Sequence, residues 1–104
     1  MPDDGIELDR LIHEPGRLAI LTVLSSVSSA DFVFLGRTTR MTNGNLSSHL
    51  TKLEAAGLVE ITKAFVGRRP NTSVALTPLG RARTAEHWER LERLKGLATD
   101  PPAG

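Results

Sequence analysis

The chain of 104 residues is long enough for one domain with a modest core and too short for a catalytic domain joined to a second one. Its thirteen basic and twelve acidic residues nearly balance, so overall charge does not by itself indicate nucleic acid, and the absence of cysteine excludes disulfide scaffolds, thiolate metal sites and cysteine nucleophiles. No apolar run approaches the ~20 residues that span a bilayer, and the acidic start of the chain is unlike a signal peptide. We therefore expect a cytoplasmic protein that does not act at a membrane.

The N-terminal part of the chain predicts a lead-in segment and then a core helix. Residues 1–5 and 99–104 have the composition of disordered tails, which leaves a single domain over 6–98. Leu8, Leu11 and Ile12 have helical spacing and predict a short helix or lead-in against the body. Pro15 can occupy the first turn of a helix over about 15–27, which is apolar on most sides and is therefore expected at the centre of the core.

Two short helices are predicted next. The serine-rich stretch 25–29 ends the core helix, and Ser28 or Ser29 can cap the following one. Residues 31–38 predict a short helix with Phe32 and Leu35 facing inward. A turn over 39–41 leads into a second helix over about 43–56, and two short helices joined in this way form a helix-turn-helix.

The second of these helices has an unusual outer face. Thr42 or Asn43 can cap its start, and Gly57 lies where it should stop. Its apolar residues recur at three- and four-residue intervals, at Leu46, Leu50, Leu53 and Ala56. The other faces carry Gly, Asn, Ser and Thr near the start instead of the Glu and Lys of an ordinary surface helix. Such a face can approach base edges and phosphates in a DNA major groove, although these residues could instead only cap and solubilise the helix terminus.

A β-hairpin with a basic tip is predicted after this helix. Residues 58–65 and 72–77 have strand patterns, and the segment 66–71 between them is turn-forming and contains Arg68 and Arg69. A hairpin that served only as a structural lid would gain little from two adjacent like charges. We therefore expect the two arginines to contact phosphates or to enter a minor groove.

Charge is distributed unevenly along the chain. Residues 36–75, which include the smooth helix and the hairpin, carry a net charge of +4, and the rest of the chain carries −3. This asymmetry places positive potential on the segment that we expect to meet phosphates.

A final helix is predicted over about 78–98, with Thr77 as its cap and Pro78 at its first position. Trp88, Leu91 and Leu94 form a stripe along it, and charged residues occupy the other faces. Part of this helix must extend past so small a body. We expect a second copy of the chain to cover the stripe, and packing back onto Leu8 and Leu11 is the alternative.

The order helix, helix-turn-helix, hairpin, helix resembles the winged helix-turn-helix transcriptional regulators, and several stretches are similar to the ArsR- and MarR-like groups. The matching stretches are residues 14–21, 45–59, 67–71 and 76–80. Their most specific feature is the run Ser-x-His-Leu followed by Leu-Glu-x-x-Gly-Leu-Val, a basic hairpin and Leu-Thr-x-x-Gly. The chain departs from these groups in lacking the cysteines of thiolate metal sensors and in having a shorter last helix than many MarR-like proteins.

The resemblance implies a mainly helical α+β fold, a winged helix-turn-helix DNA-binding domain. Residues 43–56 would be the recognition helix in the major groove, residues 58–77 a two-stranded β-hairpin wing, and residues 78–98 a C-terminal dimerisation helix. The protein would be a sequence-specific transcriptional regulator, most simply a repressor, that binds a pseudo-palindromic operator in double-stranded DNA as a homodimer.

Two sets of site residues follow from this interpretation. The residues expected to contact DNA are Asn43, Asn45, Ser47, Ser48, His49, Thr51, Lys52, Arg68, Arg69, Arg17, Arg37 and Arg40. The residues expected at the dimer interface are Leu8, Leu11, Ile12, Trp88, Leu91 and Leu94.

Catalysis is not expected. Adjacent helix residues diverge by about 100° around the axis, so Ser48 and His49 do not present a nucleophile to a base. We interpret His49 as lying at the helix–DNA margin or packed under the wing.

No metal and no cofactor are expected either. His13, His49 and His87 are scattered without metal-ligand spacing, and His87 beside Glu86 is interpreted as part of a solvated face. A small-molecule effector could occupy a dimer cleft, although nothing in the sequence identifies one. The main alternative function is a winged helix that binds protein, with RNA as a further partner class, since the fold does not dictate DNA.

Overall fold

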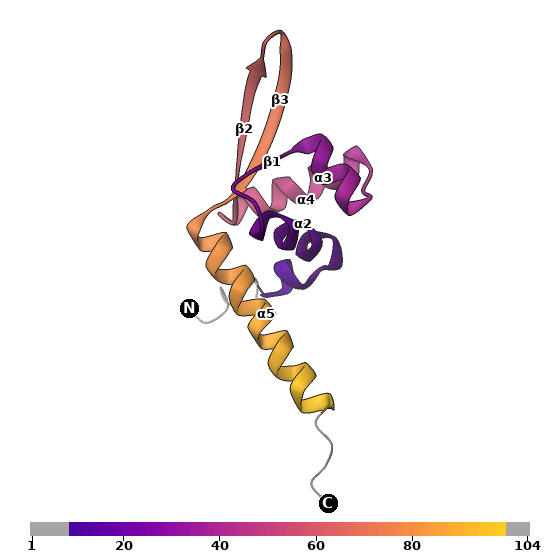
Figure 1. The fold of residues 1–104 in the computed structure, drawn as a ribbon, viewed down its shortest axis with the longest axis vertical. Helices are drawn as coiled ribbons and strands as arrows, with labels where there is room; N and C mark the ends of the chain where they lie inside the picture. Colours follow the sequence, from indigo (N-terminus) through magenta and orange to yellow (C-terminus); the bar gives the residue numbers. More distant parts are fainter. Residues whose placement is uncertain (1–8, 100–104) are drawn as a thin grey trace, which may run out of the picture.

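The computed structural model describes residues 9–99, so the expectations for the two tails and for Leu8 lie outside the described residues. A helical segment over 9–13 is followed by the elements α2 (Pro15–Ser25), β1 (Ala30–Asp31), α3 (Phe32–Thr39), α4 (Asn43–Ala55), β2 (Val59–Val66), β3 (Arg69–Leu76) and α5 (Pro78–Thr99). Figure 1 shows a small helical body from which the β2–β3 hairpin and the outer half of α5 project in opposite directions. No helix within residues 9–99 is long and apolar enough to cross a membrane.

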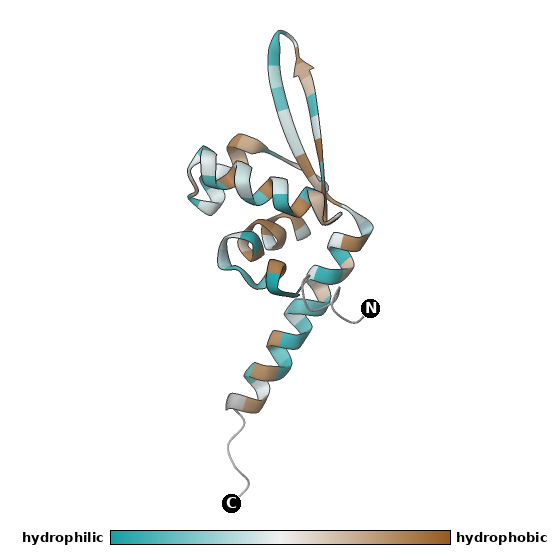
Figure 2. Ribbon diagram, turned by 180° about the vertical axis from the view of Figure 1, so that it is seen from behind, coloured by the Kyte–Doolittle hydropathy of each residue, from teal (hydrophilic) through white to brown (hydrophobic). Residues whose placement is uncertain are grey.

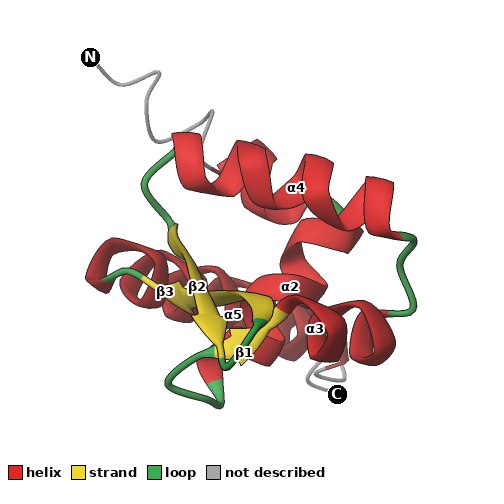
Figure 3. Ribbon diagram, turned by 90° about the horizontal axis from the view of Figure 1, so that it is seen from above, coloured by secondary structure: helices red, strands yellow, loops and turns green. Residues whose placement is uncertain are grey.

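The mainly helical α+β fold is confirmed, and its sheet has one strand more than the sequence predicted. The order is β1-β3-β2 with antiparallel pairing, and β1 joins through the pairs Ala30↔Val74 and Asp31↔Ser73. Figure 3 shows the sheet beside the helices α2 and α3. A strand of two residues carries no alternating pattern, which is why β1 was not predicted.

The hairpin turn is shorter than predicted. The β2–β3 register runs from Val59↔Leu76 to Val66↔Arg69, so only Gly67 and Arg68 form the turn, and residues 69–71 belong to β3. Gly67 has a φ of +66°, and a positive φ at the first position of a two-residue turn matches the right-handed twist of the flanking strands.

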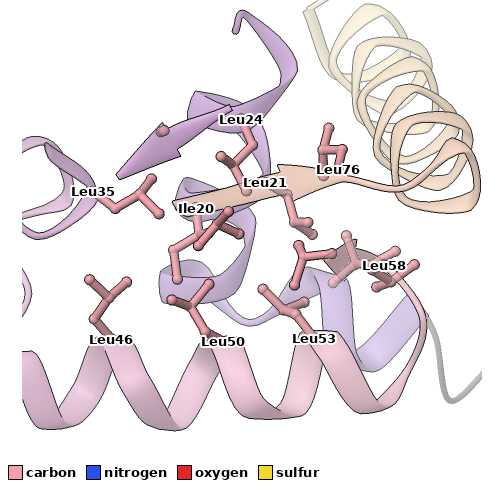
Figure 4. Packing of buried hydrophobic residues seen from close by; sticks show 13 residues of the cluster. Ile20, Leu21, Leu24, Leu35, Leu46, Leu50, Leu53, Leu58 and Leu76 are labelled. Atoms are coloured by element: carbon pink, nitrogen blue, oxygen red, sulfur yellow. The ribbon is translucent and has the colours of Figure 1, made fainter. Parts of the chain in front are cut away.

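The core forms where α4 packs across α2. Leu46, Leu50 and Leu53 of α4 are buried, and Figure 4 shows them pointing toward the buried side chains of α2. The remaining buried hydrophobic residues come from the 9–13 segment, α2, α3, the three strands and the residue before β2, and they include Ile12, Ile20, Leu21, Leu24, Leu35, Leu58, Val74 and Leu76. Each fully buried leucine stabilises the fold by about 1.5–3 kcal/mol, so this cluster fixes how α4 sits on the body.

Side-chain and glycine caps fix both ends of α4. The Thr42 hydroxyl accepts a hydrogen bond from the Asn45 backbone N–H at 3.1 Å, which selects Thr42 over Asn43 as the cap. At the other end Gly57, with a φ of +78°, follows the last turn, and the Leu58 N–H donates to the Leu53 carbonyl at 3.0 Å. This is a Schellman arrangement, and it confirms the predicted stop at Gly57.

The cap of α3 differs from the prediction. Asp31 accepts from the Phe34 N–H at 2.7 Å, whereas Ser28 and Ser29 lie before β1 and cap nothing in this helix. The prediction was wrong because β1 separates the serine-rich turn from the helix.

The start of α5 is fixed against the end of α4. The Thr77 hydroxyl accepts from the Gly80 N–H at 2.9 Å, as predicted for the cap, and donates to the Gly57 carbonyl at 2.6 Å. Gly80 lies so close to Leu58, the residue before β2, that a Cβ there would be 1.9 Å from the Leu58 carbonyl oxygen. Only a glycine permits this approach, which sets the rotation of α5 relative to the body.

Candidate nucleic-acid interface

The smooth face predicted on α4 is exposed. The side chains that turn away from the core and are exposed are those of Asn43, Asn45, Ser47, Ser48, Thr51 and Lys52. Gly44 is also exposed, and a Cβ added there would meet nothing within 4 Å. The face therefore combines amide and hydroxyl groups with a stretch of bare backbone, which suits close approach to a groove.

His49 lies on the same helix but is held by the start of α2. Its Nδ1 is 3.4 Å from Arg17 Nη1, and its Nε2 is 3.8 Å from Glu14 Oε1. Gly16 makes room for the ring, since a Cβ there would be 2.8 Å from Nε2. The structure thus places His49 against the start of α2, and the alternative that it packs under the wing was wrong.

Arg17 and Glu14 are themselves anchored at this junction. Arg17 Nε donates to the Leu11 carbonyl at 2.7 Å, which leaves the guanidinium partly buried. Glu14 caps α2 by accepting from the Arg17 N–H at 2.8 Å, and this hydrogen bond is the main reason that the pKa of Glu14 is lowered. The junction therefore positions α4 relative to α2, in addition to any contact that Arg17 and His49 make with DNA.

Four predicted phosphate-contacting residues lie on the surface, two at the tip of the wing and two at the end of α3. Arg68 occupies the hairpin turn and Arg69 opens β3, while Arg37 lies in the last turn of α3; all three are exposed. Arg40 ends α3 with a φ of 58°, and its N–H bonds to the Gly36 carbonyl. A left-handed arginine is uncommon, and no sequence signal predicted it.

The wing and α4 share one concave surface. A groove of about 630 Å³ runs between them and is lined by Phe32, Ser47, Leu50, Thr51, Glu54, Ile61, Lys63 and Thr72. Polar side chains of α4 and a lysine of the wing thus face the same opening. Lys63 was not predicted as a site residue, and only the strand register places it on the groove side, two residues beyond Ile61.

The prediction that His87 lies on a solvated face of α5 was wrong. Gly80, Thr84 and His87 form the buried stripe, and His87 is only 5% exposed instead of solvated. Its Nε2 lies 3.3 Å from His13 Nδ1, and burial is the main cause of its lowered pKa, with the charge of His13 second. No sequence pattern indicates this pair, because His13 and His87 are 74 positions apart.

The predicted dimer residues are divided between the core and the surface. Ile12 lies in the core of the protomer, and Leu11 is partly buried against it. Trp88 is 40% exposed and its indole N–H donates to the Thr22 hydroxyl at 2.9 Å, while Leu94 is 56% exposed. Leu91 and Leu94 also line an apolar groove of about 500 Å³ between residues 9–15 and α5.

The chain matches a known protein family and a known relative. The family described as a winged helix DNA-binding domain matches residues 17–95. An uncharacterized protein of Methanocaldococcus jannaschii is 37% identical over 72 residues, which are 69% of this chain and 78% of that protein.

Two solved structures share the fold. A transcriptional regulator homologue of Pyrococcus horikoshii OT3 superposes with a TM-score of 0.82 at 26% identity, over 91% of this chain and 97% of that one. A MarR family transcriptional regulator from Silicibacter pomeroyi superposes with a TM-score of 0.70 at 24% identity, over 98% of this chain and 68% of that one.

Proposed function

This chain belongs to the winged helix DNA-binding domain family and is a DNA-binding transcriptional regulator, and we propose that it acts as a cytoplasmic, homodimeric repressor on a pseudo-palindromic operator. The resemblance to winged helix-turn-helix regulators is confirmed by the family match and by the solved neighbours. Family and fold also favour a regulator over an enzyme. In the proposal, the bound protein represses by occluding a promoter.

The observation that carries the proposal is the exposed face of α4 beside the basic wing. α4 is fixed by three buried leucines and by caps at both ends, and its outward groups are amides, hydroxyls and bare backbone. A rigid helix with this face can enter a major groove, where Asn and Ser side chains can hydrogen-bond to base edges. In the proposal Asn43, Asn45 and Ser48 choose the sequence.

Basic residues around this helix supply attraction to phosphates. Arg37, Arg40, Lys52, Arg68 and Arg69 are exposed and surround α4 or lie on the wing. Each neutralised phosphate steepens the dependence of log affinity on log salt by roughly 0.9. Changing Arg68 and Arg69 together to Ala should therefore flatten the slope by about one to two units per protomer, and an unchanged slope would remove the wing from the phosphate contacts.

The exposed stripe of α5 supports the homodimer. Leu94 and Leu97 are exposed large apolar side chains on the part of α5 that projects from the body, and Figure 2 shows hydrophobic bands recurring along this part. Trp88 is nearer the body, where its indole N–H donates to Thr22, and it is still 40% exposed. A second copy related by a two-fold axis would cover them. Two recognition helices would then meet successive major grooves about 34 Å apart. Because Ile12 packs inside the protomer, we leave it out of the proposed interface.

Selection from random-sequence duplex DNA tests the proposal. The purified protein is incubated with the duplex pool at about 50 mM and about 200 mM salt, and the retained DNA is sequenced. Recovery of an inverted repeat would support both sequence-specific binding and a two-fold dimer. Recovery of a single half-site would support DNA binding and contradict the dimer.

A folded protein that enriches no sequence would contradict the proposal. The alternative would then be a winged helix that binds a protein partner. The exposed face of α4 argues against this alternative, because an apolar or acidic face would suit a protein partner better than Asn, Ser and Gly do.

A further inference from the structure

Two histidines from distant parts of the chain meet where the 9–13 segment lies against α5. His13 Nδ1 and His87 Nε2 are 3.3 Å apart, and the two rings are tilted by 57°. His13 is exposed, whereas His87 is 5% exposed and its Nδ1 is buried without a hydrogen-bond partner among residues 9–99. The pair therefore joins a histidine that solvent reaches to one whose charge state depends on its buried surroundings.

The geometry of the pair opposes the uptake of a proton. We assign the hydrogen bond of the neutral pair to His87 Nε2–H, which donates to His13 Nδ1 and leaves His87 Nδ1 as a lone pair. If either ring takes up a further proton, this hydrogen bond persists only with an N–H on His87 Nδ1. That N–H is buried without an acceptor, so the protonated pair is destabilised in this arrangement.

The charges around the pair do not offset this cost. The charged side chains that line the adjacent groove, from the 9–13 segment, the cap of α2 and α5, are Asp9, Arg10, Glu14 and Arg90. Burial is the main cause of the lowered pKa of His87, and His13 and Arg90 lower it further. Asp9 raises this pKa, but its carboxylate is paired with Arg90 at 3.0 Å. Protonation is therefore easier once the 9–13 segment and α5 separate.

The segment that carries His13 also contacts the side chain that holds α4. Arg17 Nε donates to the Leu11 carbonyl at 2.7 Å, and Arg17 Nη1 lies 3.4 Å from His49 Nδ1 on α4. The segment is one helical turn with Ile12 buried in the core, so a displacement at His13 also moves Leu11. Arg17 thus connects the histidine pair with α4.

We propose that the His13–His87 pair is a pH-sensitive contact that, through Arg17, keeps α4 in position for DNA while the pair is neutral and releases it when the pair is protonated. This inference rests on the proposed function, because it concerns the affinity for DNA. Acid separates the 9–13 segment from α5, the Leu11 carbonyl leaves Arg17, and α4 loses a contact that fixes its orientation. Acid therefore weakens binding. A proton on His49 would have the opposite effect, since a positive charge on α4 attracts phosphates.

The pH dependence of the affinity tests the proposal. The chain has three histidines, so each can be replaced in turn. The full chain is titrated against one labelled duplex of mixed sequence, at constant ionic strength, between about pH 7.5 and about pH 5.5. Wild-type protein should bind about three- to tenfold more weakly at the acid end. His13→Gln and His87→Gln should change by less than about twofold, whereas His49→Gln should retain the weakening.

Tryptophan fluorescence follows the contact in the absence of DNA. Trp88 is the single tryptophan of the chain, follows His87 on α5 and donates to Thr22 of α2, so its emission reports the contact of α5 with the body. The emission should change over the same pH range in wild-type protein and not in His13→Gln. Linkage is reciprocal, so bound DNA should shift the midpoint of this change to lower pH. Circular dichroism should show that the helices persist at the acid end.

The outcomes separate this inference from the proposed function. Wild-type protein that binds no duplex at neutral pH would overturn both. Binding that is unchanged or tighter in acid would overturn the histidine contact and leave the proposed function standing. Weakening that persists in His13→Gln and His87→Gln, or that coincides with loss of helical circular dichroism, would overturn it as well. Weakening that persists in Arg17→Gln would overturn the connection to α4.

Discussion

Replacing Gly44 by alanine should stabilise the protein and weaken its binding to DNA. Gly44 is the second residue of α4, and a Cβ there meets no atom of the protomer within 4 Å. Alanine in place of glycine stabilises a helix by roughly 0.5–1 kcal/mol, and we take about 0.5 kcal/mol for a position in the first turn. For a domain of this size that corresponds to a rise in Tm of about 2–4 °C.

The effect on DNA binding should have the opposite sign. If the bare backbone at Gly44 lies against base edges or phosphates, the added methyl group forces the helix outward. Overpacking by one methyl group in a close interface costs about 1–3 kcal/mol, which is a loss of affinity of roughly five- to 150-fold. A general defect in folding could not produce this result, because the same variant is more stable than the wild type.

Thermal unfolding and fluorescence anisotropy with a labelled duplex measure the two effects. Gly96→Ala is the matched control, because Gly96 also lies in a helix with nothing within 4 Å but on α5, away from the recognition face. It should raise Tm without changing the affinity for DNA. If Gly44→Ala bound the duplex as tightly as the wild type, the start of α4 would not lie against DNA, and the major-groove assignment would be refuted.

Three further predictions concern α5. Gly80→Ala would place a Cβ 1.9 Å from the Leu58 carbonyl oxygen, so α5 must shift by about 1 Å. The free energy of unfolding in urea should therefore fall by about 2–4 kcal/mol. A loss below about 0.5 kcal/mol would contradict this packing. Burial lowers the pKa of His87, so the unfolded chain binds the proton more readily, and stability should decline as the pH falls below the ordinary value of 6.5. His87→Gln should reduce that decline, and equal urea midpoint profiles for both proteins would exclude His87 as its cause. If the proposed dimer forms through α5, Leu94→Gln should raise its dissociation constant at least tenfold in analytical ultracentrifugation, whereas Glu92→Gln, a control on the same exposed helix, should not.

The features of this protein that the sequence predicted are those set by local chemistry. The helix at 43–56 was predicted from leucine spacing, and the structure has it as Asn43–Ala55. Thr42, Gly57 and Thr77 act within one turn of their own positions, so their roles follow from the neighbouring residues alone. The outward placement of the polar face of α4 follows in the same way, because burying the leucines leaves only one side for it.

Features that depend on contacts between distant residues were missed. The strand β1 exists because β3 offers Val74 and Ser73 as partners, and nothing in residues 30–31 alone predicts a strand. The two-residue turn at Gly67 depends on the β2–β3 register, which decides whether Pro70 lies in a loop or opposite Phe65. Both differences matter for function, because the register sets the direction of every side chain on the wing.

The orientation of α5 shows where sequence information ends for this protein. Its sequence determined a capped helix with an apolar stripe, since propensity, capping and periodicity are local properties. Which side faces the body was decided by tertiary packing. Gly80 lets the backbone of α5 approach Leu58, and this approach turns His87 inward to meet His13 while Leu94 stays exposed. A helix with small, polar and apolar residues around its axis has several sides that could be buried, and only close contact with the rest of the chain selects one of them.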